Sequence, residues 1–290
     1  MTTRLLFVHA LSPLHAGTGH SIGAVDLPIA RDRATSHPIL PGSTIKGCLR
    51  DAAEGESWTV GVFGTERKNA PMHSGSAVFG DANLLLLPVR SIYGTFAWVT
   101  CPLALERYRR DAAGTVPKEK IPKTTSIGKP AQVAITKTSV LKGTARVVFE
   151  DLDFEVASDG ADMATGWASH LGESLFAAAE SSWRESFQSR FCIVPDDVFT
   201  HLAENATDVV TRVSIDKDSK TVAKGQLWTE ESLPTESVLV SLVFVRPPVE
   251  SGMKAATVVE HLQSLTSRPV QFGGKATVGR GRCRLVLAGG

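Results

Sequence analysis

Two strongly apolar runs near opposite ends of the chain restrict the folds that it can adopt. Residues 4–11 (RLLFVHAL) and 238–245 (VLVSLVFV) are almost continuously apolar, which is typical of strands buried on both faces. A helix is predicted from about residue 43 to 54, and a second helix is marked by the apolar stripe Val258, Val259, Leu262 and Leu265. With a last strand through Leu287, this order is compatible with a β-α-β-β-α-β core. Spacing alone supports an α+β fold.

The middle of the chain also holds strands and helices. Residues 76–99 contain two strand-like runs, which Pro88 is predicted to separate, and Cys101-Pro102 opens a helix toward Ala113. A four-residue repeat of apolar side chains predicts one helical core face between residues 161 and 190, with Gly172 as the candidate break. The stripe consists of Trp167, Leu171, Leu175, Ala179, Trp183 and Phe187.

A β-hairpin is predicted over Thr211–Pro234, where two alternating runs flank the polar turn DKDSK. A glycine-rich loop, 273–281, then precedes the last strand. This loop does not fit a nucleotide-binding P-loop, because Lys275 is followed by Ala276 and residue 269 is proline.

Composition limits the class of protein. At 290 residues the chain can be one domain (1–290) with insertions at 55–75, 114–147 and 211–234. A net charge of +1 does not indicate a nucleic-acid binder, so any RNA surface must come from local clustering. The four cysteines are far apart and predict buried thiols in a reduced cytoplasm. No apolar run approaches the ~18 residues of a membrane span, so no membrane contact and a cytoplasmic location are expected.

One segment stands out by its charge. Between residues 114 and 147, seven basic residues accompany a single acid, Glu119, among threonine, proline and glycine. Such a run is typical of a solvated, mobile loop, and contact with RNA is the functional alternative. The basic residues are Lys118, Lys120, Lys123, Lys129, Lys137, Lys142 and Arg146.

Residues 15–50 place one carboxylate, Asp26, among glycines and cations shortly before a helix start. In PGSTIKG, Ser43 is predicted to be the N-cap, so that Lys46 occupies the third helical position, where a capping box would hold glutamate. A cation there opposes the helix dipole at a cost of roughly 0.3–1 kcal/mol unless an anion binds. Gly42 and Gly47 would allow a ligand to come close. The pattern predicts a phosphate-binding surface with one reactive acid.

Each of these residues also has a plainer interpretation. Asp26 can be a turn carboxylate ahead of an extended X-Pro segment. His15, near a strand end, can be structural, although an imidazole also suits a general acid or a phosphate contact. Lys46 and Arg50 are four residues apart on one helix face, which can simply be solvated.

Five segments, taken in order, resemble a known family. They are similar to the RAMP superfamily and, more narrowly, to the repeated backbone subunit of type III-B (Cmr) CRISPR RNA-guided effector complexes. The match covers both ends and the middle of the chain, and residues 60–205 match only loosely. The segments are HAGTG (15–19), VDLPIARD (25–32), PGSTIKGCLRD (41–51), TRVSIDKDSKTVAKGQLWTEESLP (211–234) and GGKATVGRGRCRLVL (273–287).

The resemblance implies an RRM-like (ferredoxin-like) palm with insertions and a protruding β-hairpin thumb. It implies that Asp26 is catalytic, lies beside the scissile phosphodiester, helps to hold a weakly bound divalent cation (Mg or Mn) and favours attack by the 2′-OH of the target. His15 is the second catalytic candidate. Glu230 and Glu231 match an acidic pair of the thumb with an auxiliary catalytic or metal-binding role, and solvated charge is their plainer interpretation.

The resemblance also implies partners. Copies of the chain would stack head to tail along the guide CRISPR RNA, with each thumb reaching over its neighbour. Target RNA would be cut at six-nucleotide intervals, leaving a 2′,3′-cyclic phosphate. Further partners would be a large polymerase-like subunit, a small subunit and end-capping RAMP subunits. The residues expected to contact guide phosphates are Ser43, Thr44, Lys46, Arg50, Gly273, Gly274, Lys275 and Arg280.

Two alternatives stay open. One is a non-catalytic RNA-binding scaffold subunit, in which Asp26 is only a turn residue. The other is a guide-processing endoribonuclease of the same superfamily, whose members usually depend on histidine rather than on a loop aspartate.

Overall fold

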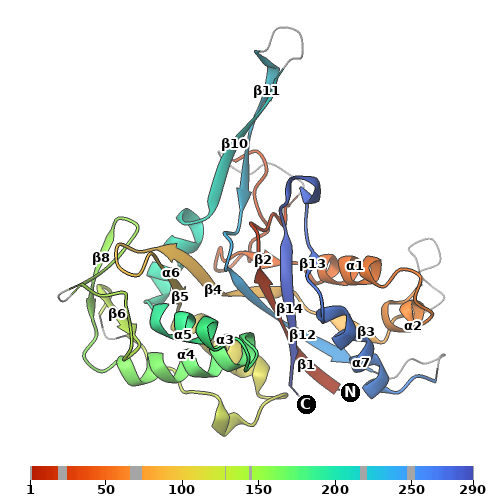
Figure 1. Ribbon diagram of the computed structural model, residues 1–290, viewed down its shortest axis with the longest axis horizontal. Helices are drawn as coiled ribbons and strands as arrows, with labels where there is room; N and C mark the ends of the chain where they lie inside the picture. The colour runs from red at the N-terminus through yellow and green to blue at the C-terminus, as the bar shows by residue number, and fades with distance from the viewer. Residues whose placement is uncertain are drawn as a thin grey trace.

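The computed structural model describes residues 2–18, 25–65, 74–127, 129–143, 146–215, 221–246 and 252–289, and only the backbone of residues 223–225. In this part of the chain, one mixed sheet of 12 strands forms the body and a separate two-stranded hairpin projects from it (Figure 1). None of the helices in these ranges combines the length and apolarity that crossing a membrane requires.

The palm half of the sheet is built from both ends of the chain. Its elements are β1 (Thr2–Ala10), β2 (Ile39–Leu40), α1 (Gly42–Ala52), α2 (Thr59–Phe63), β3 (Ala77–Phe79), β4 (Ala82–Arg90), β12 (Val238–Val245), α7 (Ala255–Thr266), β13 (Val270–Gln271), η3 (Ala276–Val278) and β14 (Arg282–Ala288). Strand β1 lies between β12 and β14 and is antiparallel to both, with Leu5 opposite Leu242 and Ala288. Helix α1 joins β1 to β3 across β12, and α7 joins β12 to β14 across β1. Two interleaved βαβ units therefore form an α+β fold, as expected.

The other half extends the sheet from β4 in the order β5, β9, β6, β8, β7 (Figure 1, at the left). Its elements are β5 (Phe96–Thr100), α3 (Pro102–Ala112), η2 (Lys118–Lys120), β6 (Gln132–Ile135), β7 (Arg146–Phe149), β8 (Leu152–Val156), α4 (Ala161–Leu175), α5 (Ser181–Arg190), β9 (Phe191–Ile193) and α6 (Asp196–Asn205).

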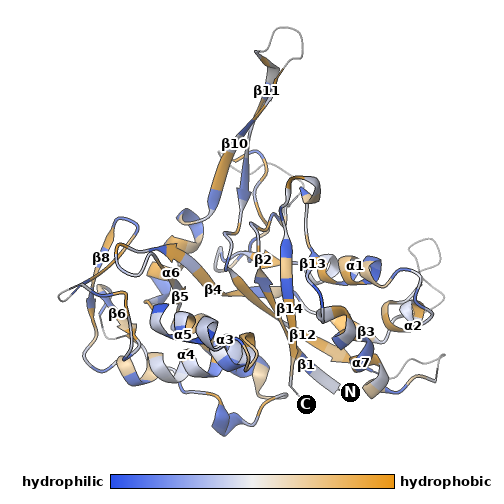
Figure 2. Cartoon of the chain, viewed as in Figure 1, coloured by the Kyte–Doolittle hydropathy of each residue, from blue (hydrophilic) through white to orange (hydrophobic). Residues whose placement is uncertain are grey.

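The core lies on both faces of the central strands. Two of these strands, β4 and β12, are largely apolar in Figure 2. Alternate β1 residues point to opposite faces: Leu6 and Val8 join a cluster with residues of α1, α6 and α7, while Leu5 and Phe7 join one with α3, α4 and α5. Burial on both faces explains why the β1 and β12 sequences are apolar without alternation.

Pro88 does not separate two strands as predicted, because it lies inside β4 opposite Trp98 of β5. Strand β4 pairs with β12 only as far as Leu86, so the missing N–H of Pro88 falls where the strand has a partner on one side only. The two runs are separated instead by the turn at residues 91–95.

The basic segment 114–147 is not simply a solvated loop. It contributes η2, β6 and the first residues of β7, and its side chains Ile121, Val133 and Leu141 are buried. Strand β6 lies between β9 and β8. Strand β6, which has only four residues, was not predicted because the segment around it is rich in charged residues.

The apolar stripe at residues 161–190 belongs to two helices, α4 and α5, which are separated at residues 176–180. Gly172 lies inside α4, where an added Cβ would come 3.3 Å from the Phe187 ring, so this glycine permits close helix packing and does not break the helix. Trp183 is exposed, unlike the other aromatic members of the predicted core face.

The projecting hairpin consists of β10 (Asp208–Ile215) and β11 (Val222–Ser232), and it is called the thumb below. It begins three residues before its predicted start, and its predicted turn, 216–220, lies outside the described residues. Opposite residues such as Val213 and Leu227 share a face, and Leu227 is 64% exposed. Of the predicted insertion at 55–75, residues 55–65 contain α2, while 66–73 lie outside the described residues.

Candidate nucleic-acid interface at the base of the thumb

The loop that carries Asp26 is attached to strand β11. Asp26 Oδ2 accepts hydrogen bonds from Thr229 N (2.8 Å) and Thr229 Oγ1 (3.0 Å), and Asp26 N donates to Thr229 Oγ1 (3.1 Å). One residue on, Leu27 N donates to Thr229 O (3.1 Å) and Leu27 O accepts from Glu231 N (3.0 Å). Asp26 is thus held by a residue 203 positions away, which a purely local turn carboxylate would not be.

The Asp26 carboxylate is exposed and ionised. The hydrogen bond from the Thr229 backbone N–H, followed by that from its hydroxyl, lowers the Asp26 pKa below its usual value. None of the described residues donates a hydrogen bond to the second carboxylate oxygen, Oδ1. A carboxylate of this kind is a poor proton acceptor at neutral pH, but it is a suitable hard ligand or electrostatic group.

His15 is attached to the same strand two residues further on. Its Nδ1 lies 2.7 Å from Glu231 O, and the residue is only 8% exposed. Its carbonyl accepts from Gly274 N (3.0 Å), and a Cβ at Gly273, whose φ is +68°, would come 2.1 Å from that oxygen. Gly273 and Gly274 therefore allow the glycine-rich loop to pack directly on the His15 backbone.

Glu230 is buried, and it lies on the face of β11 opposite to that of Glu231. Its carboxylate is therefore not exposed to solvent. Its Oε1 accepts from Trp228 Nε1 (2.7 Å) and Lys275 Nζ (2.8 Å), and Arg212 Nε lies 3.5 Å from Oε2. Burial alone would raise the Glu230 pKa, but the hydrogen bonds from Lys275 and Trp228 and the two cationic charges hold it below its usual value. The plainer interpretation of Glu230 is therefore wrong.

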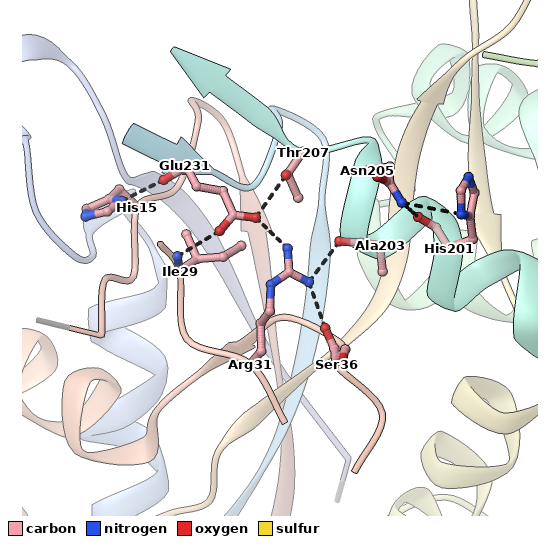
Figure 3. A network of polar contacts seen from close by, with 9 residues as sticks. All are labelled: His15, Ile29, Arg31, Ser36, His201, Ala203, Asn205, Thr207 and Glu231. Atoms are coloured by element: carbon pink, nitrogen blue, oxygen red, sulfur yellow. Dashed lines mark hydrogen bonds and ion pairs between the residues drawn. The ribbon is translucent and has the colours of Figure 1, made fainter. Parts of the chain in front are cut away.

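Glu231 is also buried, at 5% exposure, and it lies in a separate network (Figure 3). Ile29 N donates to its Oε2 (3.0 Å), while Thr207 Oγ1 (2.9 Å) and an Arg31 guanidinium nitrogen (2.5 Å) donate to its Oε1. Arg31 also donates to Ser36 O (2.7 Å) and Ala203 O (2.9 Å). The interpretation as solvated charge is wrong here too, because the carboxylate has an ion-pair partner inside the molecule.

The donor set at the thumb base fits a weakly held cation. Among the described residues, no group of three or more histidine, cysteine, aspartate or glutamate side chains could form a metal site. Of the three predicted acids, Glu230 and Glu231 are occupied by cationic partners, so Asp26 is the one whose carboxylate could face a cation. A divalent ion at Asp26 would need RNA phosphate oxygens and water to complete its coordination.

The start of α1 differs from its prediction. The helix begins at Gly42 after Pro41, with no side-chain cap from Ser43, and Gly42 N donates to Asp81 Oδ1 (2.8 Å). Lys46 is therefore the fifth helical residue rather than the third. The unfavourable first-turn cation is absent, and an acid already lies at the positive end of the dipole. Asp81 could not be assigned this role locally, because it lies 39 residues away along the chain.

A groove with a volume of about 460 Å³ follows the side of α1 and is lined by Ser43, Lys46 and Arg246. Arg246 donates to Ser74 Oγ (2.8 Å), and Arg50 donates to Thr65 O (3.1 Å). Partial burial, then the charges of Arg50 and Arg246, lower the Lys46 pKa. Among the described residues, none of these three cations pairs with a carboxylate. The groove is therefore suited to an anion.

The structure sorts the predicted site residues into two groups. Thr44 belongs with Ser43, Lys46 and Arg50 on α1, and its amide donates to Pro41 O. The remaining residues lie around the thumb base. There the Arg280 amide donates to Lys275 O. Burial raises the Asp208 pKa, and the positive charge of the Arg280 side chain partly offsets this rise. The group at the thumb base is His15, Asp26, Glu230, Glu231, Gly273, Gly274, Lys275 and Arg280.

Four residues with parts in these arrangements were missed in the sequence. Thr229 lies within the matched thumb segment and Arg31 within VDLPIARD, so both were in view but had no recognisable partner. Thr207 directly precedes β10 and Arg246 directly follows β12, and neither residue belongs to a recognisable motif.

Comparison with known proteins shows to which family the chain belongs. The model of the RAMP superfamily matches residues 7–284. The chain therefore belongs to the RAMP superfamily and, because nearly its full length matches a Cmr4 protein at 31% identity, to the family of Cmr4 subunits within it. It is 31% identical over 294 residues to the CRISPR system Cmr endoribonuclease Cmr4 of Pyrococcus furiosus, covering 99% of this chain and 96% of the relative. It is 25% identical over 295 residues to the CMR subunit Cmr4 of Saccharolobus solfataricus, covering 95% and 93%.

Solved structures show the same fold. The crystal structure of oligomeric Cmr4 from Pyrococcus furiosus superposes with a TM-score of 0.78 at 25% identity, over 100% of this chain and 99% of that one. A chain in the cryo-EM structure of type III-B Cmr-beta bound to cognate target RNA gives a TM-score of 0.75 at 20% identity, over 99% and 97%. The resemblance to a Cmr backbone subunit is thus confirmed.

Proposed function

We propose that this protein is the backbone subunit of a type III-B CRISPR RNA-guided effector complex and the endoribonuclease that cuts its bound target RNA. The observation that carries the proposal is the exposed, ionised Asp26 carboxylate, fixed to the thumb base by Thr229. It occurs in a chain that is similar over nearly its full length to a protein named a Cmr endoribonuclease.

The reaction is a transesterification within the target strand. The 2′-oxygen of one nucleotide attacks the adjacent phosphorus and loses its proton to solvent, and the bond from phosphorus to the 5′-oxygen breaks. The products are a 2′,3′-cyclic phosphate and a 5′-hydroxyl. A Mg or Mn ion held in part by Asp26 would supply positive charge that stabilises the transferring phosphoryl group. The Asp26 carboxylate would help to hold that cation, and its lowered pKa favours this role over proton uptake.

Guide RNA is bound through its phosphates at two places. Lys275 and Arg280 provide cations in the glycine-rich loop, and Lys46, Arg50 and Arg246 provide them beside α1. Contacts of this kind do not distinguish bases, so target choice is left to base pairing with the guide. The small net charge of the chain is compatible with binding because the cations are locally concentrated.

The thumb supports assembly of copies head to tail along the guide. One of its faces is apolar and exposed: Val209, Val213, Ile215, Val222 and Leu227. We infer that this face contacts the neighbouring copy and its guide–target duplex, and that each thumb displaces one base pair, so that cuts recur at six-nucleotide intervals. Target RNA and the other Cmr subunits complete the particle, which we expect in the cytoplasm.

The test is to reconstitute the complex with Asp26→Asn subunits. This substitution keeps the shape of the side chain and removes its charge, so guide assembly and target binding by gel shift should be preserved. Single-turnover cleavage with magnesium or manganese should fall about 10²-fold or more, equivalent to about 2.7 kcal/mol. Cleavage at the wild-type rate by a complex that binds target normally would refute the nuclease assignment and support the scaffold alternative. A histidine-dependent guide-processing role is disfavoured by the burial of His15.

A further inference from the structure

We propose that Glu231 is a positioning residue which, together with Arg31, fixes the Asp26 loop to both strands at the thumb base. The inference rests on the proposed function of Asp26 and adds a cause for its placement. Glu231 would not touch RNA. It would determine whether Asp26 lies where cleavage requires it, and it would couple that placement to the thumb.

The bonds to the Glu231 carboxylate come from two separate parts of the chain, the Asp26 loop and the residue before β10. Ile29 N, three residues after Asp26, donates to Oε2, and Thr207 Oγ1, just before β10, donates to Oε1. The Arg31 guanidinium donates to the same Oε1. Among the bonds of the described residues, Glu231 Oε2 is the acceptor of the Ile29 amide. Loss of this carboxylate would therefore remove the bond that holds Ile29, three residues after Asp26, and loosen the loop there.

Arg31 extends the network to the helix that leads into the thumb. It donates to Ala203 O in α6 and to Ser36 O further along its own loop (Figure 3). Helix α6 ends at Asn205, and β10 begins at Asp208. A change in the thumb's orientation at this junction would move Thr207 relative to Ala203, and through Glu231 and Arg31 it would move the segment 27–31.

The surroundings of Glu231 exclude direct contact with a substrate. Both of its carboxylate oxygens are occupied by donors, and its side chain is 7% exposed. The Asp26 carboxylate, by contrast, is exposed, and described residues donate only to its Oδ2. Removal of one partner from a buried ion pair leaves the other partner uncompensated, so Arg31 and Glu231 should act as one unit.

The experiment measures loop order and cleavage on matched variants. Glu231→Gln, Arg31→Gln and the double variant are made in the full chain, with Thr207→Val and its hydroxyl-preserving control Thr207→Ser. Hydrogen exchange of the Ile29 amide is measured on the purified chain, and single-turnover cleavage on the reconstituted complex. Target affinity is measured by gel shift, so that loss of binding is separated from loss of chemistry.

We expect Glu231→Gln to raise Ile29 exchange and to lower the cleavage rate by about 10- to 100-fold, the range that a small misplacement of a catalytic group can cause. Target affinity should stay within about twofold. Because the pair acts as a unit, the double variant should lose no more than the worse single variant. Thr207→Val should shift in the same direction, and Thr207→Ser should restore both readouts.

Two results would overturn the inference. One is cleavage at the wild-type rate by Glu231→Gln, whether or not Ile29 exchange rises. The other is multiplication of the two single losses in the double variant, which would mean that Arg31 and Glu231 act separately. Failure of the proposed function is distinguishable, because it appears as wild-type cleavage by Asp26→Asn, a variant that leaves the bonds of Glu231 unchanged.

Discussion

Lys275 Nζ lies 2.8 Å from Glu230 Oε1, and this ion pair joins the glycine-rich loop to the thumb. Lys275 Nζ also lies 5.8 Å from the centre of the Trp228 ring, and Trp228 belongs to β11, as Glu230 does. The lysine expected to contact guide phosphate therefore already holds a buried carboxylate in the free chain. Its substitution should affect stability as well as RNA binding.

The Glu230 pair predicts a pH-dependent contribution to stability. The Glu230 pKa is lowered in the folded chain from its ordinary value of 4.5, so its stabilisation is present above that pH and is lost as pH falls through the lower folded value. The melting temperature of Glu230→Gln should lie below that of the wild type at pH 7, with the difference shrinking below about pH 4.5. A constant difference across this range, measured by calorimetry, would contradict the assignment.

Thr229 predicts a shift in the acid limb of cleavage. Thr229→Val keeps the backbone N–H but removes the hydroxyl that lowers the Asp26 pKa, so that pKa should rise toward its ordinary value. The rate of the reconstituted complex should then begin to fall at a higher pH than in the wild type. The control is Thr229→Ser, which retains the hydroxyl and should retain the wild-type profile. Identical profiles for all three proteins would show that the hydroxyl does not tune Asp26.

The α1 groove predicts loss of guide affinity without loss of sequence tolerance. Lys46→Ala and Arg246→Ala should each weaken guide binding equally for unrelated guide sequences and lower the salt slope by about one phosphate contact. Arg90→Ala, which removes an exposed cation paired with Glu150, serves as the control and should leave both quantities unchanged. A sequence-dependent loss, measured by filter binding at several salt concentrations, would argue against a backbone contact.

The exposed face of the thumb predicts a defect in assembly. Leu227→Glu places a charge where an apolar side chain is exposed, so the circular dichroism spectrum should hardly change. Filament formation on guide RNA and the regular ladder of cut products should both decline. Deletion of residues 216–220, which lie outside the described residues, should have the same effect. Ser214→Asp, on the opposite face of β10, is the matched control, and an undiminished ladder from Leu227→Glu would refute the role of this face.

The parts of the fold that could be read from the sequence are those set by local pattern. The apolar runs at 4–11 and 238–245 indicated buried strands because both of their faces lie in the core. The N-cap of α1 was placed two residues late, at Ser43 and not at Pro41, because the N-terminal partner of the helix, Asp81, is distant in the sequence. Strand β6 was missed because four residues within a charged segment carry too little periodicity to be recognised.

The candidate site was only partly accessible for the same reason. The resemblance selected Asp26, Glu230 and Glu231, and the structure places all three at the thumb base. The sequence could not show that the two glutamates are buried, or that they have different partners. Those differences depend on Lys275 and Arg31, which the fold brings to β11 from opposite ends of the chain.

The central strand β1 is paired with β12 and β14, so a ribosome makes its hydrogen-bonding partners long after β1 itself. Asp26 likewise has its partner in β11, late in the chain. During synthesis the acidic loop would therefore emerge long before anything can hold it. A nascent or prematurely terminated chain that lacks β11 would carry the carboxylate without its partner, so the proposed site could form only after β11 has been made.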